Sequence, residues 1–131
     1  MPSIEESVRT MLTSSTALSG GIPDARITFG YRLQSSVLPA VTFSLQDAVP
    51  ASLDGERSVD IEVSYIAATA LEAAEAEPDV RAAIRSGTFS TNRINAAVFT
   101  GSRVDEPITA DGDEQQPAVL VCNATLYYEL L

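Results

Sequence analysis

The sequence contains no histidine and no lysine. Without histidine the chain lacks the commonest general base, the commonest metal ligand and the imidazole of the standard serine and cysteine triads. Without lysine it cannot supply the phosphate-binding residue of a P-loop, and the glycine pair Gly20-Gly21 is followed by Ile-Pro rather than by a phosphate-loop pattern. These absences exclude the most familiar catalytic and nucleotide-binding sites, and we expect that the protein is not an enzyme.

Cysteine is nearly absent, because Cys122 is the one cysteine in the chain. One thiol cannot form an internal disulfide or a cysteine-based zinc site. Cys122 lies in an apolar run from Ala118 to Ala124, where a free cysteine usually packs as a small hydrophobic residue. We therefore predict a buried thiol with a structural role.

Long apolar runs are absent as well, since no window approaches the ~20 apolar residues of a membrane span. The beginning of the chain carries Glu5 and Glu6 without a basic region, which is not the pattern of a secretory signal. A chain of 131 residues, 45% of them hydrophobic, is long enough for one core. We expect one soluble domain over residues 1–131 that stays in the cell or virion where it is made.

The charge is strongly one-sided, with 18 acidic residues against 8 arginines and a net charge of -10. Such a surface repels nucleic-acid phosphates, which argues against DNA binding by the whole surface, and it keeps a protein dissolved at high concentration. Two origins fit the use of arginine alone: a genome rich in G and C, or a host with a salty cytoplasm. The melting temperature in molar KCl tests the second origin, because a value lower than in dilute buffer would contradict it.

The first half of the chain predicts one helix and three strands. Ser3 and Glu6 form a capping box, after which apolar residues recur at helical spacing to Leu18, so we expect a helix over residues 4–18. Alternating apolar residues predict strands at 26–31, 40–46 and 59–65. The last two strands are expected to pair as an antiparallel hairpin with a long tip.

The second half predicts a helical region and two strands. Thr69 and Glu72 form another capping box, and Pro78 either kinks the helix or opens a second short one. We expect Gly87 to end this region. The residues expected to share its buried face are Leu71, Ala74, Val80, Ala83 and Ile84.

The last two predicted strands cover residues 94–104 and 118–129. Ile94, Ala96, Val98 and Thr100 alternate along the first of them. The final strand is apolar on both faces, which is typical of a central strand or of one covered by a partner. The predicted fold is α+β: a mixed, mainly antiparallel sheet of about five strands with two helices packed on one face.

The carboxylates offer weak candidates for chemistry. Residues Asp111-Gly112-Asp113-Glu114 faintly resemble a calcium loop, but an EF-hand needs ligands over twelve residues with glycine at the sixth place. Asp60 and Glu62 lie on the polar face of a predicted strand, where solvation explains them. We therefore expect no metal site and no cofactor. The arginines, Arg26, Arg32, Arg81 and Arg85 among them, are expected to pair with carboxylates within or between subunits.

The order of elements and several short segments resemble one family. The segments are 8–12 (VRTML), 37–43 (VLPAVTF), 53–55 (LDG), 59–63 (VDIEV) and 126–128 (LYY). In this order the chain resembles the tail-completion, or tail-terminator, proteins of long-tailed phages and related viruses. The resemblance spans nearly the whole chain, and it departs from the family in the acidic insertion at 105–116 and in Pro78.

The resemblance implies a structural virion protein without catalytic residues. Members of the family form rings, typically hexamers, that cap the finished tail tube and join it to the neck. The implied partners are further copies of the chain, the tail-tube protein and neck or connector proteins, with DNA passing through the lumen without specific binding and with no membrane. The implied location is the virion tail and neck, after assembly in the host cytoplasm. Alternatives are another head-tail connector, such as an adaptor or head-closure subunit, a small acidic binding module and, more distantly, an enzyme that uses carboxylates alone.

Two segments are candidate contact sites in such a ring. Some carboxylates of an acidic loop are expected to face a DNA channel or a neighbouring ring, and the tip of the hairpin is expected to contact a neighbouring subunit. The residues of the acidic loop are Asp105, Glu106, Asp111, Asp113 and Glu114. Those of the hairpin tip are Asp47, Pro50, Leu53, Asp54 and Arg57.

Overall fold

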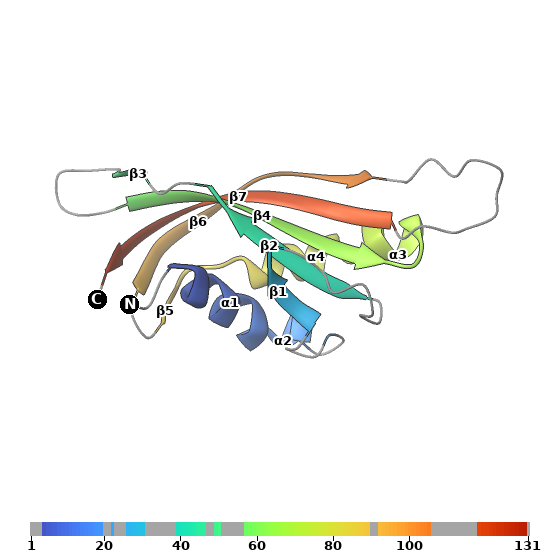
Figure 1. The fold of residues 1–131 in the computed structure, drawn as a ribbon, viewed down its shortest axis with the longest axis horizontal. Helices are drawn as coiled ribbons and strands as arrows, with labels where there is room; N and C mark the ends of the chain where they lie inside the picture. The colour runs from blue at the N-terminus through green and yellow to red at the C-terminus, as the bar shows by residue number, and fades with distance from the viewer. Residues whose placement is uncertain are drawn as a thin grey trace.

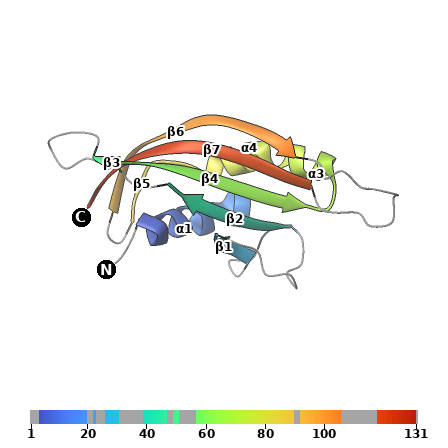
Figure 2. The same ribbon diagram turned by 45° about the horizontal axis from the view of Figure 1, so that its top comes forward.

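A computed structural model describes residues 4–19, 22, 26–30, 39–46, 49–50, 57–89, 92–105 and 118–130. The fold is α+β, with a long mixed sheet that curls over a layer of short helices (Figures 1 and 2). In chain order the elements are α1 (Ile4–Ser14), α2 (Thr16–Ser19), β1 (Ile27–Phe29), β2 (Ala40–Leu45), β3 (Val49–Pro50), β4 (Arg57–Ala67), α3 (Ala70–Glu75), α4 (Glu77–Ala83), β5 (Gly87–Thr88), β6 (Asn92–Asp105) and β7 (Ala118–Leu130).

The sheet has the strand order β1-β2-β4-β7-β6-β5, and β3 pairs with β4 beside this path. β1 is parallel to β2, and the other pairings are antiparallel, including the predicted hairpin of β2 and β4. The five strands expected from the sequence are all present. The two-residue strands β3 and β5 add to them, because two residues are too few to show an alternating pattern.

β7 is the central long strand, between β4 and β6, as its apolar character predicted. Its residues Leu120, Cys122, Ala124, Leu126 and Tyr128 are buried against the helices. This side of the sheet is called the inner face below, and the opposite side the outer face. The two helical regions pack together on the inner face, and α2 contacts α4. The prediction of helices on one face is confirmed.

The first helical region is interrupted, whereas the sequence predicted one helix over residues 4–18. α1 ends at Ser14 and α2 begins at Thr16. The hydroxyls of Thr13 and Ser14 both donate to the carbonyl of Thr10, and side chains that bond the backbone in this way compete with the helix. The apolar face is as expected, since Val8 and the residues that follow it one turn later are fully buried. Ser3 of the expected capping box lies outside the described residues.

In the second helical region the predicted cap at Thr69 is confirmed, and Pro78 opens a second helix rather than kinking the first. The Thr69 hydroxyl accepts a hydrogen bond from the Glu72 amide at 3.2 Å. Pro78 lies in the first turn of α4, where a proline needs no amide, so it opens a second helix. The region ends at Ala83 rather than at Gly87, which belongs to β5.

The predicted buried face of this region was partly wrong. Leu71 is 68% exposed and Ala74 is also exposed, whereas the buried residues are Ala73, Ala76, Val80, Ala83 and Ile84. The buried residues keep a helical spacing of three or four positions from Ala73 through the junction to Ala83, so the prediction selected the wrong face of α3 when it included Leu71 and Ala74.

The sequence pattern also predicted that Ile94, Ala96, Val98 and Thr100 share one face of β6, and this prediction was wrong. The register shifts between Ile94 and Ala96 and again between Phe99 and Gly101. Each β-bulge moves the following side chains to the other face of the sheet. Ile94 is therefore buried, whereas Val98 is 48% exposed.

Candidate functional site

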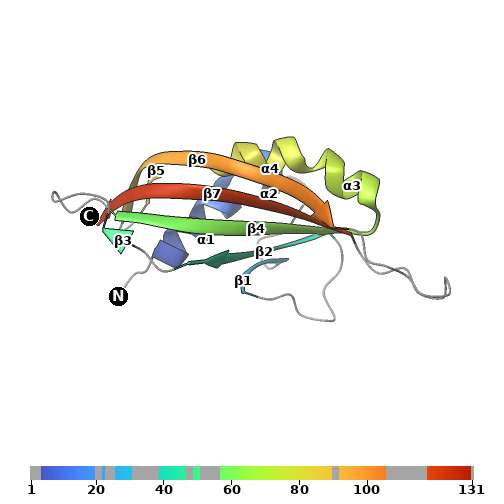
Figure 3. The same ribbon diagram turned by 90° about the horizontal axis from the view of Figure 1, so that it is seen from above.

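The outer face of the sheet is the first candidate surface, because no described helix covers it (Figure 3). Asp60 and Glu62 of β4 lie on this face beside Thr125 and Asn123 of β7, their respective partners in register. The period-2 alternation of β4 requires this arrangement, since Val59, Ile61 and Val63 are buried on the inner face. The outer face is thus polar at its centre.

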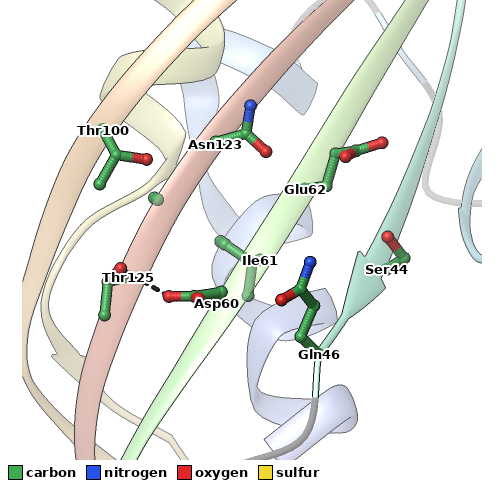
Figure 4. Close-up of a pocket in the computed structure, with 9 residues that line it drawn as sticks. Ser44, Gln46, Asp60, Ile61, Glu62, Thr100, Asn123 and Thr125 are labelled. Carbon is green, nitrogen blue, oxygen red and sulfur yellow. Dashed lines mark hydrogen bonds between the residues drawn. The ribbon is translucent and has the colours of Figure 1, made fainter.

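A shallow depression of about 290 Å³ lies in the outer face (Figure 4). The Thr125 hydroxyl donates to the Asp60 carboxylate at 2.7 Å across the strands. Thr100 of β6 and Ser44 of β2 approach from the two sides (Figure 4). The full lining is Ser44, Gln46, Asp60, Ile61, Glu62, Thr100, Asn123, Ala124 and Thr125.

The side chains of this depression are suited to binding a polar partner rather than to catalysis. Its side chains offer carboxylates, hydroxyls and amides, and its lining includes no arginine. Neither its carboxylates nor its hydroxyls are deeply buried, so water screens them. Among the described residues there is no group of three or more His, Cys, Asp or Glu side chains that could hold a metal ion. The arrangement can bind polar groups but does not activate a nucleophile.

A second depression, of about 490 Å³ and wide open, lies between the helices and the sheet at the end where β2 begins. Its lining combines Tyr65 and Pro39 with a carboxylate cluster formed by Glu72, Glu75 and Asp79, together with Ala76. Burial raises the pKa of Tyr65, the carboxylates of Asp79 and Glu72 raise it further, and Arg26 acts in the opposite direction. This place therefore has a negative potential, which suits a cationic partner.

The third candidate surface is the free edge of β6. β5 pairs only with Arg93 and Ile94, so from Ala97 to Asp105 β6 has β7 as its one strand partner among the described residues. Two arginines lie on this side of the molecule. Arg81 of α4 lies 4.1 Å above the centre of the Phe99 ring and pairs with Glu77 at 2.6 Å. Arg103 pairs with Asp105 at 3.3 Å, and both side chains are more than half exposed.

The predicted acidic loop is described only at its first residue. Asp105 is the last residue of β6 and lies opposite Val119 of β7. The other candidates of this loop, Glu106, Asp111, Asp113 and Glu114, lie outside the described residues.

The predicted hairpin tip is described at two positions. Pro50 of β3 is the register partner of Arg57, the exposed first residue of β4. The other candidates, Asp47, Leu53 and Asp54, lie outside the described residues. Arg57 pairs in register with Tyr128 at the end of β7, whereas Asp105 lies opposite the beginning of β7. The structure therefore places Arg57 and Asp105 at opposite ends of the sheet.

Two sets of neighbouring side chains on these surfaces could not be predicted from the sequence. The pair of Asp60 and Thr125 joins residues 65 positions apart, and nothing local signals it. The carboxylate cluster collects residues of α3 and α4 against Tyr65 of β4. Its only sequence signal is the acidic character of residues 72–79.

Comparison with protein-family models and with curated proteins finds no match to this chain. In the part of the chain that the structure describes, no helix is long and apolar enough to cross a membrane.

Proposed function

We propose that the protein is a structural virion subunit that assembles into a ring, terminates a tail tube and joins it to the neck. The proposal starts from the resemblance to tail-terminator proteins. The observation that carries it is the uneven covering of the sheet. Helices bury the inner face, while the outer face and the β6 edge have no covering element among the described residues.

Such surfaces suit a subunit whose neighbours complete it. An uncovered strand edge offers backbone hydrogen-bonding groups to another chain, and proteins that work alone usually cover or shorten such edges. Val98 on β6 and Leu71 on α3 are large apolar side chains that remain exposed, at 48% and 68%. Ring contacts would remove both kinds of surface from water, with a gain of ~25 cal/mol per Å² of apolar area.

The charge supports the same role. The described residues carry ten carboxylates and seven arginines, so most of the net charge of -10 comes from segments outside them. Four of the carboxylates outside the described residues follow Asp105 in the segment that links β6 to β7: Glu106, Asp111, Asp113 and Glu114. In our proposal this segment faces the DNA channel or a neighbouring ring, because a negatively charged lumen lets DNA pass without adhesion.

Electron microscopy of the assembled particle tests the proposal. We expect a ring of this chain between the tail tube and the neck, with the segment after Asp105 at the lumen or at the next ring. A location elsewhere in the particle contradicts the terminator role, and an outer position of the segment without a partner contradicts the channel role. The genes on either side give an independent check, since portal, capsid and tail-tube genes are expected there.

Two alternatives predict different results. An adaptor or head-closure subunit would also form a ring, but it would lie on the head side of the neck. A small acidic binding module is favoured by the polar depression around Asp60 and Thr125, and it would remain monomeric both alone and with purified tail tubes. Native mass spectrometry of the chain, with and without tail tubes, separates the module from the ring-forming subunits.

A further inference from the structure

The beginning of β4 extends past the helix layer of the fold. Side chains of β4 alternate between the two faces, and Arg57 lies on the inner side because its register partner Tyr128 is buried there. The next inner residue, Val59, is almost fully buried, whereas Arg57 is exposed. Figures 1 and 3 show this end of β4 beyond the first turn of α1. Arg57 therefore lies on an overhang, defined here as the inner side of β4 at Arg57, which no described helix covers.

The depression in the outer face attracts cations. Asp60 and Glu62 contribute two carboxylates, which only accept hydrogen bonds when they are ionised. The Thr125 hydroxyl donates its one proton to Asp60, so its oxygen is left as an acceptor. The lining includes no arginine, and neither carboxylate forms an ion pair with a described residue. The depression therefore has a negative potential that no described arginine of the same copy neutralises by pairing.

An arginine side chain complements this depression. Its guanidinium has five N–H donors, no acceptor and a permanent charge, so it matches a lining of carboxylates, hydroxyls and amides. At about 290 Å³ the depression is wide enough for the end of one long side chain. Arg57 is available for this contact because it forms no ion pair with a described residue. Arg81 and Arg103, in contrast, pair with carboxylates of their own helix or strand.

The overhang and the depression face in compatible directions. The overhang exposes its inner side, whereas the depression opens on the outer face, so the sheet end of one copy can overlap the sheet of the next. No described helix lies between the two surfaces, because the described helices pack on the inner face and end before Arg57 (Figure 3). Arg93 is exposed at the same end of the sheet, but its register partner Glu129 lies on the outer side of β7. Arg93 therefore points away from a copy that the overhang covers.

We infer that the beginning of β4 in one copy lies on the outer face of a second copy, where Arg57 enters the depression beside Asp60 and Glu62. This inference rests on the proposed ring and specifies the subunit contact within it. Because the two contacting surfaces differ, the contact is heterologous, and it generates a closed ring when the rotation between copies closes.

A charge exchange tests the inference in the full chain. Arg57→Glu places like charges at the contact, as does Glu62→Arg, and the double variant restores opposite charges. We expect each single variant to raise the concentration of half-assembly by about tenfold and the double variant to recover most of that loss. Mass photometry over a concentration series, with native mass spectrometry at its upper end, is the measurement, alone and with purified tail tubes.

Two matched controls separate the contact from the effect of net charge. Arg93→Glu changes the charge as much as Arg57→Glu does at the same end of the sheet, and Glu75→Arg matches Glu62→Arg but lies on α3. All four positions are exposed, so we expect every variant to fold. The two control variants should assemble like the wild type. Control variants that weaken assembly as much as their counterparts, or a double variant that recovers nothing, contradict the contact.

Cross-linking tests the proximity of the two positions. Arg57→Cys and Glu62→Cys are expected to cross-link through a short bis-maleimide when the two single variants are mixed, whereas neither variant should cross-link with itself. A linker is needed because an arginine side chain keeps the two backbones too far apart for a direct disulfide. Cys122 remains in place, because its buried thiol has a pKa raised to about 11 and is a poor nucleophile at neutral pH.

The outcomes separate the inference from the proposed function. Assemblies that tolerate Arg57→Glu and give no mixed cross-link overturn the contact and leave the ring proposal standing. Assemblies that show the contact but occupy no position at the neck overturn the terminator role and leave the contact standing. A chain that remains monomeric at all concentrations, and also with tail tubes, overturns both.

Discussion

The side chains of Ser7 and Asn92 join the first helix to the beginning of β6 through a buried hydrogen bond. The Asn92 amide nitrogen donates to the Ser7 hydroxyl at 2.8 Å, and both residues are almost fully buried. Ser7 lies on α1 and Asn92 begins β6, 85 positions later. The bond therefore attaches the first helix to the inner face of a strand from the other half of the chain.

Ser7→Ala removes the acceptor of this buried donor. A buried polar group that loses its partner costs about 1–3 kcal/mol, so we expect the free energy of unfolding to fall by that amount in urea titrations. Ser14→Ala is the matched control on the same helix, because Ser14 is exposed and its change should stay within about 0.5 kcal/mol. Equal losses for the two variants would contradict a specific role for the buried bond.

Cys122 should be unreactive in the folded protein. Burial, together with the carboxylate of Glu77, raises the pKa of its thiol to about 11 from its ordinary value of 9.0, while Arg81 acts in the opposite direction. We expect a thiol reagent at pH 8 to label Cys122 only after denaturant is added. Rapid labelling of the native protein would show that the inner face opens.

The same thiol links stability to pH. Because its folded pKa is raised, the unfolded chain loses the proton first, and the free energy of unfolding falls as pH rises from about 9 to about 11. Tyrosines also ionise in this range, so the comparison must be made with Cys122→Ala. The slope that the wild type shows in excess of this variant belongs to the thiol, and the absence of any excess contradicts the assignment.

The Thr69 cap should carry measurable stability. Thr69→Ala removes the acceptor for the Glu72 amide, which typically costs about 1 kcal/mol. Thr69→Ser and Thr69→Asp keep an oxygen at this position and should recover most of the loss in thermal or urea unfolding. Failure of both to do so would show that the methyl group of Thr69, rather than its hydroxyl, matters.

Salt should stabilise the protein. With a net charge of -10, the carboxylates repel one another in the compact state, and molar KCl weakens this repulsion because it shortens the screening length to about 3 Å. We expect the melting temperature to rise from dilute buffer to molar KCl, and to rise less in a variant with Asp111→Asn, Asp113→Asn and Glu114→Gln. A lower melting temperature in molar KCl would contradict both the repulsion argument and the origin in a salty host.

Local chemistry was sufficient for much of the fold. The cap at Thr69 and the alternation of Val59, Ile61 and Val63 could be predicted because each depends on residues within one turn or along one strand. Pro78 limited its helical region to two alternatives, a kink or a second helix, and the structure has the second helix. The apolar character of residues 118–129 likewise predicted a strand that is central in the sheet or covered by a partner. The absence of histidine and lysine narrowed the possible chemistry through composition alone.

Tertiary structure decided the features that depend on distant residues. The bulges of β6 exist only relative to β7, so they turned Val98 outward against the sequence pattern. The packing of α3 against β4 and β7 decided which of its faces is buried and left Leu71 in water. The sequence by itself determined where the two helical regions and the five predicted strands lie, because hydrophobic period and caps are local. Only the tertiary structure decided which faces and edges stay uncovered, because that depends on strand order and on where the helices pack.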